Sequence, residues 1–71
     1  MPQFELDTDG APRQARGRSP QDAARRALGL APDARLELGE PEAGTQWAEL
    51  RVDGMPAGRI RPRGRMRFRR D

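Results

Sequence analysis

The chain has 71 residues, of which 34% are hydrophobic and 35% charged, with a formal net charge of +3 in which every basic residue is an arginine. Because cysteine and histidine are absent, the composition excludes a disulfide framework, a thiolate zinc site and the commonest general base in enzymes. No apolar run approaches the roughly 20 residues that cross a bilayer, and no signal-peptide pattern opens the chain. We expect one small domain, residues 1–71, with a thin core and a cytoplasmic or nucleoid location.

The first predicted element is a short strand at residues 4–7, where apolar and acidic residues alternate. Asp9-Gly10 then favours a tight turn, since Gly10 can adopt a positive φ. Residues 14–18 return as a second strand. We interpret Asp7 and Asp9 as solvated turn residues, not as an acid–base or cation-binding pair.

A helix of about ten residues follows, and its start is marked by three consecutive signals. Ser19 has the side chain of an N-cap, Pro20 suits the first helical position, and Asp22 favours the helix dipole. Gly29 ends the helix. Its apolar stripe consists of Ala23, Ala24, Ala27 and Leu28, and Leu30 extends it just past the helix end.

Two further strands are predicted before the arginine-rich end of the chain. Leu36 and Leu38 belong to the first, and a polar loop covers residues 39–45. Residues 47–53 form the second, with its apolar face on the even numbers. Two roles are open for Trp47, stacking on a base or wedging a base step on the one hand and packing in the thin core on the other, and we favour packing. Asp53-Gly54 turns the chain again. The sequence thus predicts an α+β fold, a small β-β-α-β-β-β sheet with a single helix packed on one face.

From Arg59 to Arg69 every second residue is arginine, and Arg70 follows. In a strand this spacing places the arginines on one face and Ile60, Met66 and Phe68 on the other. Pro62 and Gly64 leave three forms open for residues 59–71: one strand that is bulged or at a sheet edge, two short strands, or a tail.

The charge is distributed unevenly along the chain. Residues 59–71 contain seven arginines and one acidic residue, whereas residues 1–58 contain seven arginines and ten acidic residues. This asymmetry indicates a polyanionic partner, because arginine matches phosphate oxygens and binding releases condensed counterions. The predicted nucleic-acid-binding residues are Arg59, Arg61, Arg63, Arg65, Arg67, Arg69 and Arg70, extended by Arg18 and Arg25.

The sequence therefore predicts a nucleic-acid-binding protein, a weakly sequence-selective architectural or nucleoid-type factor, with duplex DNA favoured over RNA. One alternative is a protein-interaction module of phage or toxin–antitoxin type that docks its arginine strand on an acidic protein partner. A second alternative is RNA binding. We expect no enzymatic activity, no metal or other cofactor and no membrane partner, and either a monomer or a small homo-oligomer.

The helix start also carries a resemblance to a known family. Its pattern Gly-basic-x-Pro-x-x-Ala-Ala-x-basic-Ala is matched by Gly17, Arg18, Pro20, Ala23, Ala24, Arg26 and Ala27. Together with Phe4-x-Leu6 and Asp9-Gly10, this stretch resembles the small monomeric chromosomal proteins of methanogenic and halophilic archaea. The resemblance covers residues 4–27. It implies the same β-β-α-β-β-β order and a DNA-compacting protein that binds and bends duplex DNA without strong sequence choice.

Overall fold

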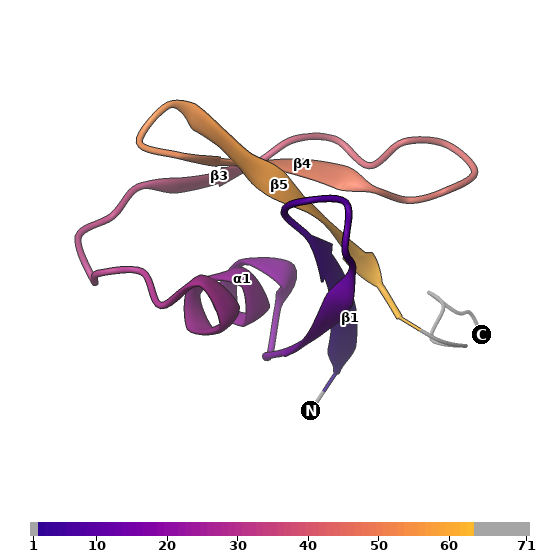
Figure 1. Cartoon of the computed structure of the whole chain (residues 1–71), viewed down its shortest axis with the longest axis horizontal. Helices are drawn as coiled ribbons and strands as arrows, with labels where there is room; N and C mark the ends of the chain where they lie inside the picture. Colours follow the sequence, from indigo (N-terminus) through magenta and orange to yellow (C-terminus); the bar gives the residue numbers. More distant parts are fainter. Residues whose placement is uncertain (1, 64–71) are drawn as a thin grey trace.

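The computed structural model describes residues 2–63 and shows five strands and one helix in the predicted order (Figure 1). The strands form one antiparallel sheet in the spatial order β2-β1-β5-β4-β3, and the predicted α+β fold is confirmed. Within residues 2–63 no helix is long and apolar enough to cross a bilayer. The elements are β1 (Gln3–Asp7), β2 (Arg13–Arg16), α1 (Pro20–Leu28), β3 (Leu36–Leu38), β4 (Ala48–Val52) and β5 (Met55–Pro62).

Helix α1 begins and ends at the predicted residues. The Ser19 hydroxyl accepts a hydrogen bond from the backbone N–H of Asp22 at 3.1 Å, which satisfies one of the unpaired donors of the first turn. The Asp22 carboxylate in turn accepts the backbone N–H of Arg18 at 3.0 Å. At the other end Gly29 takes the left-handed conformation, with φ of 64°.

The core lies between α1 and the inner face of the sheet. Leu6, Leu50 and Ile60 are almost fully buried on the sheet side, and the helix contributes the small side chains of Ala23 and Ala24. Small helical residues let the helix approach the chain that leads into it. A Cβ on Gly17 would lie 2.4 Å from the Ala23 nitrogen, so only glycine fits there.

Strand β5 occupies the centre of the sheet, between β1 and β4. Of the forms left open for this stretch, a strand at the sheet edge is therefore excluded as far as Pro62, and the strand begins at Met55, earlier than predicted. Proline is tolerated because the backbone bonds to β1 come from odd-numbered residues, as in Arg63 N–H to Gln3 O at 3.1 Å. The even-numbered residues face β4, whose first residue, Ala48, lies opposite Ile60. Pro62 thus lies beyond the end of β4, where no ladder hydrogen bond is required.

The turn between β4 and β5 has the chemistry that its sequence predicts. Asp53 and Gly54 both have positive φ, 53° and 81°. Val52 lies opposite Met55, so this is a two-residue hairpin turn that matches the twist of the flanking strands. The hairpin brings β5 back against β4 and then between β4 and β1, which places its arginines at the middle of the sheet.

Candidate nucleic-acid interface

The alternation predicted for the arginine-rich stretch is confirmed as far as the structure describes it. Ile60 is 1% exposed in the core, whereas Arg59 and Arg61 project from the opposite face of β5, which we call the outer face of the sheet. Arg63 follows the strand and is exposed. The remaining members of the predicted site lie outside the described residues; these are Arg65, Arg67, Arg69 and Arg70, with their neighbours Met66 and Phe68.

The two outer-face arginines of β5 are ion-paired with carboxylates of β1. Arg59 donates from Nε and Nη2 to Oδ2 of Asp7 at 3.2 and 3.1 Å. Arg61 places Nε and Nη2 each 2.9 Å from Oε1 of Glu5. We predicted from the sequence that Asp7 is a solvated turn residue. This is corrected, because Asp7 is 8% exposed, binds Arg59 and also accepts the Gly10 N–H at 2.7 Å.

These ion pairs orient the guanidinium groups and leave part of each one accessible. In both pairs the carboxylate binds the Nε–Nη2 edge, and within residues 2–63 neither Nη1 makes a hydrogen bond. The side chains of Arg59 and Arg61 remain 48% and 35% exposed. A guanidinium has five N–H donors in a fixed fork, so each group keeps donors for an external acceptor.

Trp47 lies next to these two arginines. Its ring centroid is 4.4 Å from Cζ of Arg59 and 4.3 Å from Cζ of Arg61, within the range of cation–π attraction. The packing role that we assigned to Trp47 in the core is wrong, since the core cluster does not include it. The sequence number of Trp47 could have placed it on the outer face, because the odd-numbered residues Glu49 and Arg51 of β4 are exposed.

The loop before β4 fixes the backbone of Trp47. Its carbonyl oxygen accepts the Glu42 N–H at 2.8 Å, and its own N–H donates to the Thr45 hydroxyl at 3.3 Å. The residue before it, Gln46, has a φ of 68°, a left-handed conformation that costs a non-glycine residue about 1–2 kcal/mol. Strain of this kind persists only where the surrounding structure determines it, and it clusters at functional sites.

The other predicted site residues, Arg18 and Arg25, do not join the outer face. Arg25 donates from Nη1 to the Ala31 carbonyl at 3.3 Å and from Nη2 to the Ala34 carbonyl at 2.7 Å. It therefore holds the connection between α1 and β3. Arg18 has an exposed side chain in the link between β2 and α1. The structure does not bring either residue together with Arg59 and Arg61.

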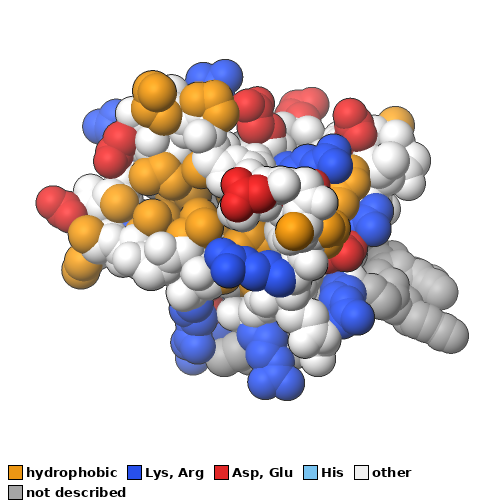
Figure 2. Space-filling view, in the orientation of Figure 1, with side chains coloured by type: hydrophobic (Ala, Val, Ile, Leu, Met, Phe, Trp, Pro, Cys, Tyr) orange, Lys and Arg blue, Asp and Glu red, His pale blue; other side chains and the backbone are white. Residues whose placement is uncertain are grey.

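Charges on the described part of the chain balance one another. Residues 2–63 contain ten arginines and ten acidic residues, and Figure 2 shows the two signs interspersed over the upper part of the face in view. On the outer face Glu49 lies opposite Arg59, and Glu37 lies opposite Arg51. The excess positive charge of the sequence therefore belongs to residues 64–71, which contain four arginines and one acidic residue.

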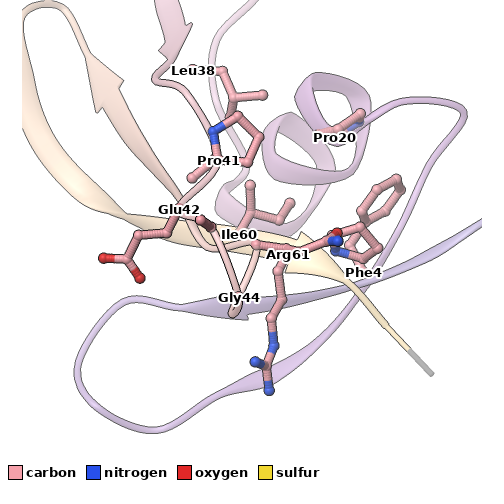
Figure 3. Close-up of a pocket in the computed structure, with 12 residues that line it drawn as sticks. Phe4, Pro20, Leu38, Pro41, Glu42, Gly44, Ile60 and Arg61 are labelled. Carbon is pink, nitrogen blue, oxygen red and sulfur yellow. The ribbon is translucent and has the colours of Figure 1, made fainter. Parts of the chain in front are cut away.

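A separate apolar groove of about 340 Å³ opens between the loop before β4, the start of α1 and the end of β5 (Figure 3). Phe4, Pro20, Leu38 and Pro41 are among its lining residues. Arg61 also borders the groove but directs its guanidinium away from it. The groove can receive an uncharged apolar group, and it is distinct from the arginine and tryptophan side chains of the outer face.

Within residues 2–63 no three His, Cys, Asp or Glu side chains are placed to hold a metal ion. No known protein family, curated protein or solved structure matches this chain.

Proposed function

We propose that this protein binds nucleic acid without strong sequence choice, as a duplex-DNA architectural factor of the nucleoid. The observation that carries the proposal is the row of outward-facing arginines on the central strand β5, which continues in sequence into Arg63 and the four arginines of residues 64–71. Arginine on an outer sheet face suits phosphate oxygens. The resemblance to the archaeal chromosomal proteins supports the same function, since it implies the strand and helix order found here.

The ion pairs divide the arginines into two roles. Arg59 and Arg61 are held in place by Asp7 and Glu5, so they offer oriented donors but little net charge. Arg63 makes no ion pair within residues 2–63. We assign to it and to the arginines of residues 64–71 the electrostatic part of binding, in which each phosphate neutralised releases condensed counterions.

The test is the salt dependence of binding to duplex DNA. If Arg63, Arg65, Arg67, Arg69 and Arg70 each meet a phosphate, the plot of log K against log salt has a slope of about −4.5, and contact by all seven arginines gives about −6. A slope near zero contradicts the proposal and favours the acidic protein partner.

A matched pair of double variants checks which arginines are responsible. Replacing Arg67 and Arg69 by glutamine is expected to make the slope shallower by about 2, because two phosphate contacts are lost. Replacing Arg13 and Arg35 by glutamine changes the net charge equally at exposed positions outside any described ion pair, and it is expected to leave the slope almost unchanged. Equal effects of the two variants would show that only the net charge matters.

A further inference from the structure

Trp47, Arg59 and Arg61 form a cluster of stacked flat groups on the outer face, which we call the Trp47 cluster. Trp47 immediately precedes β4, and the two arginines lie on β5, the neighbouring strand at the middle of the sheet. Both guanidinium carbons lie within 4.4 Å of the ring centroid. Trp47 is half-buried, so the cluster is supported from below and reachable from solvent.

From this arrangement we propose that the Trp47 cluster is a nucleobase-stacking site, and that the protein prefers nucleic acid with unpaired bases. The inference rests on the nucleic-acid binding proposed above, and it changes the preferred ligand from duplex DNA to strands with unpaired bases. Unpaired bases stack on aromatic side chains and on arginine guanidinium planes, and the cluster offers both kinds of surface together. A base can add to the exposed side of an arginine or replace one guanidinium against the indole.

The charges around the cluster favour a base over a dense array of phosphates. Glu5 and Asp7 accept hydrogen bonds from its arginines, and Glu49 lies opposite Arg59. These carboxylates offset the positive charge of the arginines, so the cluster attracts an array of phosphates only weakly, whereas the face of a base carries no charge. The free Nη1 donors of Arg59 and Arg61 can then hold the phosphate next to a stacked base. In a duplex the bases are stacked on one another. The face of a base can therefore contact the Trp47 cluster only after the base has left the stack.

The loop before β4 prepares the site in advance. Both backbone polar groups of Trp47 are hydrogen-bonded to that loop, and Gln46 adopts a left-handed conformation immediately before it. The carboxylates of Asp7 and Glu5 likewise hold the guanidinium groups of Arg59 and Arg61 in place. A stacking surface held in place before binding loses less conformational freedom when a base arrives.

The experiment compares oligodeoxythymidine, oligouridine and duplex DNA with equal numbers of phosphates, and follows the fluorescence of the single tryptophan. Both single strands are expected to change the emission and to bind at least about tenfold more tightly than the duplex. The relative affinities of the two strands decide between DNA and RNA as the source of the bases.

Variants of Trp47 separate stacking from charge. These variants lack the tryptophan, so their binding is measured by the fluorescence anisotropy of a labelled oligonucleotide. Trp47→Leu is expected to weaken single-strand binding about tenfold and to leave duplex binding and the salt slope unchanged. Trp47→Phe retains a ring and should keep most of the affinity, so it preserves the test if the leucine variant does not fold. Met55→Leu alters another exposed apolar residue and serves as the control.

The outcomes distinguish this inference from the proposed function. Salt-dependent binding that is equal for single strands and duplex, with the Trp47 emission unchanged, would overturn the stacking site and leave nucleic-acid binding standing. The absence of salt-dependent binding to all three ligands would overturn both.

Discussion

Asp7 and Arg59 are separated by 52 positions in the chain and meet across the first and last described strands, where Oδ2 of Asp7 accepts two hydrogen bonds at 3.2 and 3.1 Å. The carboxylate is 9% exposed and the arginine side chain 48% exposed. Since the other oxygen of Asp7 accepts the Gly10 N–H, this one carboxylate links the β1–β2 turn to the central strand. Asp7 therefore stabilises the fold and also orients Arg59 on the outer face.

Replacing Asp7 by alanine is expected to lower the free energy of unfolding by about 1–3 kcal/mol, because the Gly10 N–H and the Arg59 guanidinium lose a shared acceptor. Urea denaturation measures the change. Asp9→Ala, at an exposed position in the same turn, is the control and should have a much smaller effect. Equal losses for the two variants would contradict the structural role of Asp7.

Replacing Glu5 by glutamine is expected to strengthen binding to duplex DNA several-fold and to steepen the salt slope by about 1, since Arg61 is no longer neutralised and gains a phosphate. Fluorescence anisotropy over a range of salt concentrations measures both quantities. Glu37→Gln removes an acidic residue from β3, away from the Trp47 cluster. If the two variants gain equally, the effect is one of net charge and Arg61 does not contact the ligand.

Gly58→Ala is expected to destabilise the fold by about 2–4 kcal/mol, through overpacking and a strained backbone. Its φ is 129°, and a Cβ there would lie 2.6 Å from the Asp7 carbonyl oxygen. At Gly39 a Cβ would meet its nearest neighbours at 3.7 Å, without a positive φ. Gly39→Ala is the control and should change the thermal midpoint little. If both variants lower the thermal midpoint by the same amount, Gly58 does not lie as close to the β1 backbone as the structure shows.

The N-cap of α1 contributes a pH-dependent component of stability. The Arg18 backbone N–H holds the pKa of Asp22 below its ordinary value of 3.8, with a further contribution from Arg26. A lowered folded-state pKa stabilises the protein above the unfolded value, and this stabilisation is lost as the pH falls through the folded value. Wild type should therefore exceed Asp22→Asn in stability at neutral pH, and the difference should shrink below about pH 4. A difference independent of pH would contradict this role of the charge.

Local signals in the sequence were sufficient for the order of the elements. Ser19 and Gly29 bound the helix as predicted, because capping depends on residues a few positions apart. The period-2 pattern placed Ile60 in the core and Arg59 on the outer face, since alternation is a property of the strand itself.

The sequence did not reveal the contacts that depend on which strands are neighbours in the sheet. The partners of Arg59 and Arg61 follow from the position of β5 beside β1, and that arrangement involves residues more than 50 positions apart. One form left open at Pro62, a strand at the sheet edge, relied on the exclusion of proline from central strands, whereas here Pro62 lies just past the end of β4. Trp47 was assigned to the core because it is hydrophobic, although the alternation of β4 predicts an outward position for it.

The most direct test of the nucleic-acid interface is an NMR titration of the labelled full chain with duplex and single-stranded DNA. We predict that shifts concentrate on the indole N–H of Trp47, the side-chain Nε–H groups of Arg59 and Arg61 and the signals of Arg63 to Arg70, while α1 shifts little. Shifts confined to α1 and the apolar groove, with the outer face unaffected, would contradict the account.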